Sequence, residues 1–245
     1  METAFHPLKP DQSFRFACHP EVPCFNQCCR DLTQHLTPYD ILRLKQRLKL
    51  DSSHFLSAHT IESTGPRSGL PIIALKPVGA ERLCPFVSAR GCTVYSDRPA
   101  SCRTYPLARA VGIHPTTGER MEQFALVREP HCRGFTCGQG PSPERHSPLE
   151  WVADQGLEPY NEINDLLLGL IQHKRRLGKA PLNPGQRARF HLALYNLDEF
   201  RRRLAEGELP MPLTKNDKAV AALNGDDTDL LRFAISWAQA TVFGA

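Results

Sequence analysis

The sequence lacks the features that mark secreted and membrane proteins. Its first ten residues contain two prolines and a lysine, and no apolar segment of the kind that a secretory signal carries. The longest apolar run, at residues 166–171, is flanked by charge and is far shorter than the ~20 residues that a membrane span needs. We therefore expect a soluble protein of the cytoplasm, where thiols stay reduced.

Several familiar cofactor motifs are also missing. No Cys-x2-Cys occurs, which argues against zinc ribbons, rubredoxin-like sites and thioredoxin-type redox motifs. Cys24 and Cys28 are followed by Asp31 where a radical S-adenosylmethionine triplet would need a third cysteine. No P-loop, His-Glu-x-x-His or strand-to-helix Gly-x-Gly-x-x-Gly is present. These absences leave irregularly spaced cysteines as the main chemical signal.

The length and composition of the chain indicate that it can fold without its cysteines. The 245 residues are 41% hydrophobic and 23% charged, which suffices for a buried core. Nine cysteines is an odd number, and two of them are adjacent, so a disulfide framework is disfavoured. The net charge of +4 is spread along the chain and gives no reason to expect a nucleic-acid partner.

Seven of the nine cysteines lie in two short runs, residues 18–29 and 84–102. Thiolates are soft, anionic donors that suit zinc, copper(I) and iron–sulfur centres. The prolines and glycines between them allow the backbone to wrap around a cation. We predict metal ligands among all nine: Cys18, Cys24, Cys28, Cys29, Cys84, Cys92, Cys102, Cys132 and Cys137. They suffice for two four-ligand sites, or for one site with spare thiols.

Positive and imidazole side chains accompany these thiols. Arg98 and Arg103 flank Cys102, and we expect them to offset the negative charge of a thiolate-bound centre. His19 and His131 each adjoin a cysteine and are either ligands or residues outside the ligand set. The alternative to ligation is that some of the cysteines are ordinary small buried side chains.

The pattern of apolar residues predicts an α-rich α+β fold with a few short strands. Residues 1–17 show no period and are expected to be irregular. Thr37 and Asp40 predict the start of a helix, and Ser147 with Glu150 predicts another. Strands are expected at residues 71–75 and 92–95, and a hairpin at 107–113 and 123–128.

The C-terminal part contains no cysteine after residue 137 and is predicted to be helical. One helix is expected to run from Asn183 to about Gly207, and the last one to begin at Asp226 or Asp227. Gly, Pro and Ser are concentrated at residues 138–146. We therefore expect a metal-binding domain at residues 1–140 and a helical segment at 147–245 packed on it.

The cysteine runs resemble a known family. Cys24-x3-Cys28-Cys29, Cys84-Pro-Phe and the run from Cys92-x2-Tyr95 through Arg98-Pro to Cys102-Arg103-x-Tyr105-Pro are similar to the YkgJ-type cysteine-cluster family. That family is described as a zinc- or iron-chelating domain, and the resemblance covers about residues 18–106. The first run departs from the family's usual Cys-x2-Cys-x2-Cys-Cys spacing, so the correspondence of individual thiols is open there.

The cysteine pattern and the resemblance together lead to three functional hypotheses. The first is a metal-binding protein that carries an iron–sulfur cluster, with zinc as the alternative. The second is an enzyme, because a related branch comprises flagellin lysine methylases thought to use an iron–sulfur centre; its partner would be a protein substrate. The third is a zinc-stapled interaction module that binds a protein partner.

Overall fold

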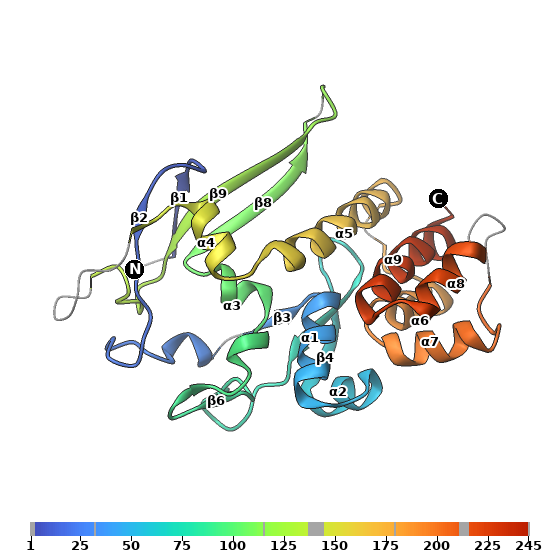
Figure 1. The fold of residues 1–245 in the computed structure, drawn as a ribbon, viewed down its shortest axis with the longest axis horizontal. Coiled ribbons are helices and arrows are strands. Elements are labelled where there is room, and N and C mark those ends of the chain that lie inside the picture. Colours follow the sequence, from blue (N-terminus) through green and yellow to red (C-terminus); the bar gives the residue numbers. More distant parts are fainter. Residues whose placement is uncertain are drawn as a thin grey trace. The chain divides into compact units, whose positions relative to one another are not determined.

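The structure is a computed structural model that describes residues 3–31, 33–114, 116–136, 145–178, 180–210 and 216–244 (Figure 1). Contacts divide the chain into two compact units. The first unit comprises Met1–Leu32 and Pro77–Asn161, and the second comprises Thr33–Lys76 and Glu162–Ala245. The units are interleaved along the chain, whereas the sequence-based division placed residues 1–140 together. The α+β fold class with C-terminal helices is confirmed.

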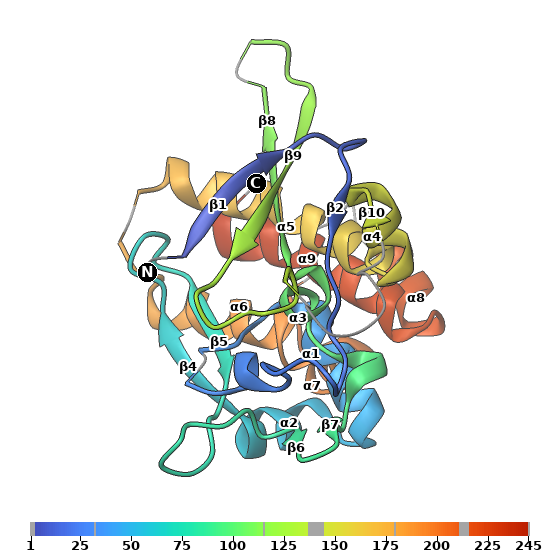
Figure 2. The ribbon, with the colours of Figure 1, turned by 90° about the vertical axis from the view of Figure 1, so that its left-hand side faces the viewer.

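The first unit is built on a three-stranded antiparallel sheet with strand order β1–β9–β8. Its strands are β1 (Ala4–Leu8), β8 (Leu107–Ile113) and β9 (Arg120–Arg128), and Figure 2 shows β9 between the other two. The predicted hairpin is therefore confirmed, with a second strand that begins earlier than expected. The expectation of an irregular N-terminus is wrong, because β1 pairs along its whole length with the distant β9.

Short elements complete the first unit. Two two-stranded sheets pair β2 (Phe14–Arg15) with β10 (Arg145–His146), and β6 (Val87–Ser88) with β7 (Gly91–Cys92). The strand predicted at 92–95 ends early, because the chain turns at once into a 3-10 helix. The helices are η1 (Gln27–Cys29), η2 (Tyr95–Asp97), α3 (Ala100–Thr104), α4 (Pro148–Asp154) and the start of α5 (Glu158–Arg176).

An aromatic core joins these pieces. It consists of the buried side chains Phe14, Phe16, Leu107, Phe124, Leu126 and Trp151. The Trp151 ring lies 5.8 Å from the rings of both Phe14 and Phe16. Its indole N–H donates to the carbonyl oxygens of Arg103 and Thr104, at 3.2 and 3.1 Å. Trp151 therefore ties α4 to the end of the cysteine-bearing helix α3.

The second unit is mainly helical. Its strands β3 (His35–Leu36), β4 (Thr60–Thr64) and β5 (Pro71–Leu75) form an antiparallel sheet with β5 in the middle. Besides most of α5, its helices are α1 (Pro38–Leu48), α2 (Ser52–His59), α6 (Pro184–Leu194), α7 (Leu197–Ala205), α8 (Asn216–Asn224) and α9 (Asp227–Phe243). Trp237 on α9 is fully buried, and its ring lies 5.3 Å from that of Phe200 on α7.

The helix starts that the sequence predicted are confirmed. Thr37 and Asp40 form a capping box at α1, and Ser147 and Glu150 form another at α4. The single helix expected from Asn183 to Gly207 is wrong, since α6 ends before Tyr195 and α7 begins at Leu197. The Tyr195 hydroxyl donates to the Pro71 carbonyl at 3.2 Å. A helical sequence pattern does not predict hydrogen bonds between residues so far apart in the chain.

The domain boundary expected at residues 138–146 falls mostly outside the described residues. Within the described part of the chain, no helix is long and apolar enough to cross a membrane.

Candidate metal centre

Eight of the predicted ligands lie in the first unit, and Cys137 lies outside the described residues. All eight described cysteines are free thiols. Cys18, Cys28 and Cys102 are exposed, and the other five are partly buried. The thiols are therefore neither paired in disulfides nor sealed in a core, and a metal ion could reach them from solvent.

Backbone contacts bring the two cysteine runs together. The amide of Cys84 donates to the carbonyl oxygen of Cys29 at 2.9 Å. The side-chain amide of Asn26 donates to the Ser88 carbonyl at 3.1 Å, and Arg82 forms an ion pair with Asp31 at 3.1 Å. These contacts hold the turn that carries Cys28 and Cys29 against the segment that carries Cys84.

A glycine in the β6–β7 hairpin permits part of this packing. Gly91 has φ +113°, a conformation that side-chain-bearing residues rarely adopt. A Cβ atom at this position would lie 3.1 Å from the ring of Phe25. Gly91 therefore lets the hairpin that bears Cys92 approach the first cysteine run.

A second close approach connects Cys132 with the first run. The Ala17 amide donates to the Gly134 carbonyl at 3.0 Å, next to both Cys18 and Cys132. A Cβ atom on Gly134 would meet Phe16 at 2.4 Å and the Ala17 oxygen at 2.6 Å. The amide of Arg133 donates to the sulfur of Cys24 at 3.1 Å. Sequence spacing alone did not predict this junction.

The electrostatic neighbours of each thiol define two groups. Partial burial, and then the nearby thiols of Cys28, Cys24 and Cys132, together raise the pKa of Cys18 to about 11. The pKa of Cys29 is raised by its hydrogen bond with Cys28, then by burial and by the thiols of Cys84 and Cys102. We call Cys18, Cys24 and Cys132 the first thiol group, and Cys29, Cys84, Cys92 and Cys102 the second thiol group.

Cys28 lies between the two groups. Its thiol raises the pKa of Cys18 in the first group and of Cys84 in the second. A hydrogen bond from Cys29 lowers the pKa of Cys28 to about 7, against the opposing effect of burial. One thiol of this adjacent pair therefore ionises readily, while the other keeps its proton.

Backbone amides point at several sulfurs. Burial raises the pKa of Cys84, Cys92 and Cys132, but amide hydrogen bonds act in the opposite direction at each of them. The donors follow their cysteine closely in sequence: Phe86 and Val87 for Cys84, Val94 for Cys92, and Gly134 for Cys132. Such N–H groups stabilise a thiolate, which is the form that binds metal.

The two predicted arginines have different surroundings. Arg98 lies close enough to the second thiol group to lower the pKa of Cys92, and its guanidinium lies 3.9 Å from the ring centroid of Tyr95. Arg98 also donates to the Tyr95 carbonyl at 2.7 Å and to the Gln155 side chain. Arg103 donates to the carbonyl oxygens of Arg98 at 3.0 Å, Gln155 at 2.6 Å and Ser96. Arg103 therefore organises the chain around α3, and only Arg98 is placed to offset thiolate charge.

Tyr105 is a site residue that sequence reasoning treated only as packing. Its hydroxyl is buried without a hydrogen-bond partner of good geometry among the described residues. Burial raises the pKa of Tyr105 above its usual range, and the neighbouring Cys132 thiol raises it further. A buried hydroxyl beside a cysteine is an available donor for a thiolate. Its place in the Cys-Arg-x-Tyr-Pro run was the only signal in the sequence.

The histidines next to the cysteines face carboxylates. His19 Nδ1 lies 3.9 Å from a Glu21 oxygen, and His131 Nε2 lies 3.6 Å from a Glu129 oxygen. These contacts favour their placement outside the ligand set.

The thiols are gathered without converging on one point. In the described ranges, no three His, Cys, Asp or Glu side chains are arranged so that they would hold a metal ion. The donor set is nevertheless chemically suited to a soft metal, with many thiols, amides directed at sulfur and a nearby arginine. Binding would require these partly exposed side chains to rotate toward a common centre.

A comparison with protein families gives one match. Residues 17–133 match the model of the CxxCxxCC family, described as a "putative zinc- or iron-chelating domain". The match confirms the cysteine-cluster resemblance, and it supports metal binding by this part of the chain. It extends beyond the residues on which the resemblance was based and includes Cys132. Searches of curated proteins and of solved structures returned no match.

Proposed function

We propose that the first unit binds an iron–sulfur cluster through its cysteines. The observation that carries the proposal is that the Cys28 thiol lies near thiols of both groups, with backbone amides directed at the sulfurs of Cys24, Cys84, Cys92 and Cys132. Hydrogen bonds to sulfur are among the protein's main means of stabilising such a centre.

The two thiol groups suggest which cysteines act together. A cluster needs four thiolate ligands, and the second thiol group offers Cys29, Cys84, Cys92 and Cys102. The first thiol group offers three, which Cys28 would complete. Arg98 acts on thiols of both groups, so it would offset negative charge whichever set binds.

The exposure of three of the thiols indicates whether a bound cluster would be structural or reactive. A bound cluster would supply one-electron redox chemistry. Exposed thiols at Cys18, Cys28 and Cys102 would leave such a centre open to a partner or substrate. This access favours a reactive centre over a purely structural one.

Anaerobic purification with a visible spectrum and analysis of iron, sulfide and zinc tests the proposal. We expect a brown protein with broad absorbance and matched iron and sulfide. A Cys84→Ser variant should lose most of the iron, whereas Ser96→Ala, on the same segment but without a thiol, should keep it. A colourless protein with about one or two zinc ions would replace the cluster by a structural zinc site. A protein without metal would overturn the proposal.

A second candidate function is an enzyme that transfers methyl groups to a protein lysine. The exposure of Cys18, Cys28 and Cys102 favours it, because a protein substrate could reach the centre. The test is transfer of labelled methyl groups from S-adenosylmethionine to flagellin by the metal-loaded protein. Transfer that disappears in Cys84→Ser supports an enzyme. Neither transfer nor binding of S-adenosylmethionine would restrict the role to metal binding or electron transfer.

A further inference from the structure

A pocket in the first unit lies on the core side of the β1–β9–β8 sheet. The register pairs His6 with Leu126 and Leu8 with Phe124 across β1 and β9. Opposed residues of an antiparallel pair share one face, and so do alternate residues along a strand. His6, Leu8, Leu126 and Arg128 therefore lie on the face that carries the aromatic core, and this face becomes more polar toward Arg128.

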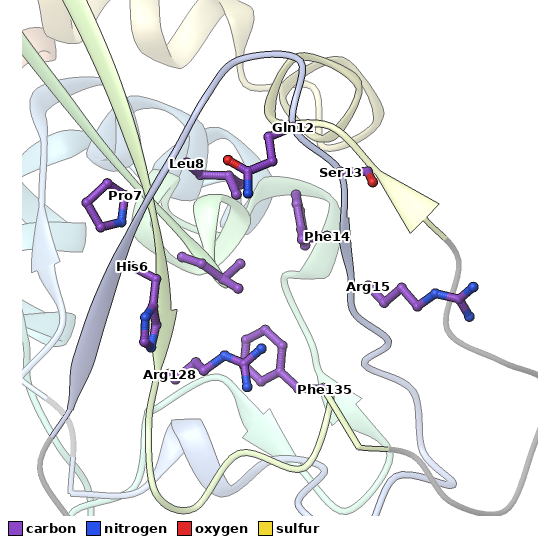
Figure 3. Close-up of a pocket in the computed structure, with 10 residues that line it drawn as sticks. His6, Pro7, Leu8, Gln12, Ser13, Phe14, Arg15, Arg128 and Phe135 are labelled. Carbon is purple, nitrogen blue, oxygen red and sulfur yellow. The ribbon is translucent and has the colours of Figure 1, made fainter.

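The floor of the pocket is apolar and its volume suits a small molecule. Phe14 and Leu126 are buried, and Leu8 and Phe135 pack against the same aromatic core. Figure 3 shows the Arg128 guanidinium against the Phe135 ring, with Leu8 and Phe14 nearby and His6 to one side. The cavity measures about 380 Å³, within the range of about 300–1,000 Å³ that is typical of ligand sites.

The charge at the rim is of one sign. Among the described residues that line the pocket, His6, Arg15 and Arg128 are basic or titratable to a cation, and none is Asp or Glu. The Arg128 guanidinium lies 4.8 Å from the centroid of the Phe135 ring, and no carboxylate in the described chain pairs with it. Stacking fixes the orientation of a guanidinium while leaving its N–H donors available.

The two residues of β2 face opposite sides. Phe14 is buried in the aromatic core, whereas Arg15 is exposed, and Figure 3 shows its side chain directed away from Arg128. Arg145, opposite Arg15 on β10, is exposed as well. The arrangement is thus an apolar floor beside the Arg128 guanidinium, with which no carboxylate of the described residues pairs.

We propose that this pocket binds a small organic anion, a carboxylate, sulfonate or phosphate that carries an apolar or aromatic body. Arg128 would donate to the anionic group, and the apolar body would lie on Phe14, Leu126 and Phe135. Inorganic phosphate would lack the apolar contacts, and a neutral aromatic compound would lack the charge-assisted hydrogen bonds. The proposal does not rest on the metal proposed for the cysteines.

The test uses the full chain and three probes. Anilinonaphthalene sulfonate combines a sulfonate with an aromatic body, N-phenylnaphthylamine is its neutral counterpart, and inorganic phosphate is the bare anion. Titrations followed by fluorescence, and by amide shifts in NMR spectra, give affinities and locate the site. The key variant is Arg128→Gln, and its matched control is Arg120→Gln on the same strand, whose side chain is exposed and does not line the pocket.

We expect one sulfonate bound per chain, with amide shifts at Leu8, Leu126 and Phe135. Arg128→Gln should weaken its binding about 10-fold or more, the loss expected for a hydrogen bond to a charged group. Arg120→Gln should change the affinity less than about 2-fold. A Phe135→Leu variant tests the same site independently by removing the stacking surface, and should also weaken binding.

Three results would overturn the proposal. The first is equal binding of the neutral compound, the second is an unchanged affinity in both Arg128→Gln and Phe135→Leu, and the third is amide shifts confined to other residues. If Arg128→Gln fails to fold, the affinity of Arg128→Lys for the sulfonate replaces it as the test. It keeps the charge but loses the planar fork, so we expect intermediate binding.

Discussion

The two units of this protein rely on different sources of stability. The second unit has an extensive apolar core in which Leu44, Phe55, Phe200 and Trp237 are completely buried. The cysteine-bearing part of the first unit consists of turns, two-residue strands and short helices, and its buried apolar side chains are few, such as Val22, Phe86 and Val94. Apolar burial stabilises a fold in proportion to the area removed from water. The second unit therefore has the larger apolar core, and we expect a bound metal to contribute more to the stability of the cysteine segments than to that of the second unit.

The buried polar groups differ in the same way. In the second unit, Lys45 is almost completely buried and forms ion pairs at 3.0 Å with both Asp198 and Asp227. Each of these charges has a partner within the protein. In the first unit, partial burial raises the pKa values of Cys84, Cys92 and Cys132, and neighbouring thiols raise them further: Cys92 and Cys28 act on Cys84, Cys28 on Cys92, and Cys24 on Cys132. The buried Lys45 thus has protein counter-ions, whereas a cation would stabilise the ionised forms of the clustered thiols.

Metal removal should give the largest effect. Structural metal sites contribute about 10–16 kcal/mol in the small domains where this has been measured. We expect a chelator to unfold the cysteine segments of the full chain while the helical far-ultraviolet circular dichroism of the second unit persists. Hydrogen exchange would show lost protection at residues 84–102 but not in α9. Loss of protection in both regions together, or in neither, would contradict the comparison.

Replacing Lys45 should destabilise the second unit at neutral pH. Although partial burial opposes it, hydrogen bonds from Ser52 and Lys45 lower the pKa of Asp198, and those from Lys45 and Arg201 lower that of Asp227. Lys45→Met leaves two carboxylates without this partner, and removing one side of a buried ion pair costs about 3 kcal/mol or more. Urea unfolding of the variant measures the loss. Lys76→Met, at an exposed position, is the control.

The same variant has a distinctive dependence on pH. Because both carboxyl pKa values are lower in the folded state, their contribution is present above the unfolded value of about 3.9 and is lost as pH falls through the folded pKa. The difference between Lys45→Met and the native protein should therefore shrink in acid. A difference that stays constant between pH ~7 and pH ~3 would show that the loss is one of packing alone.

Gly134→Ala should have a smaller effect, located in the first unit. The added Cβ would overlap Phe16 and the Ala17 carbonyl, and overpacking of this kind costs about 1–3 kcal/mol. The metal content should fall as well, because the contact joins the segments of Cys18 and Cys132. Gly112→Ala, where the Cβ would meet nothing within 4 Å, is the matched control. Equal losses of stability in both variants would argue against the close approach.

Tyr105→Phe should change the stability least, by less than about 1 kcal/mol, because among the described residues the hydroxyl has no partner of good geometry to lose. Its effect should be on the metal centre. If the hydroxyl donates to a thiolate of the loaded site, its removal should lower the reduction potential and alter the visible spectrum. Identical spectra and potentials for the variant and the native protein would leave Tyr105 as a packing residue.

The sequence determined many local features of this protein. The capping residues Thr37, Ser147 and Asn183 specify helix starts through hydrogen bonds to amides within one turn. The hairpin of β8 and β9 follows from two alternating runs and a turn. The cysteine runs indicated soft-metal chemistry because the identity of the donor atom needs no fold to be known.

Only the tertiary structure decided what depends on contacts between distant residues. The N-terminal residues form a strand because β9 supplies their hydrogen-bond partners. Residues 33–76 join the C-terminal helices because Lys45 and Ser52 bind Asp198. The division of the thiols, the structural role of Arg103 and the place of the Tyr105 hydroxyl beside Cys132 likewise depend on neighbours far apart in the chain. Spacing cannot report such neighbours, because their proximity arises only when the separate segments pack.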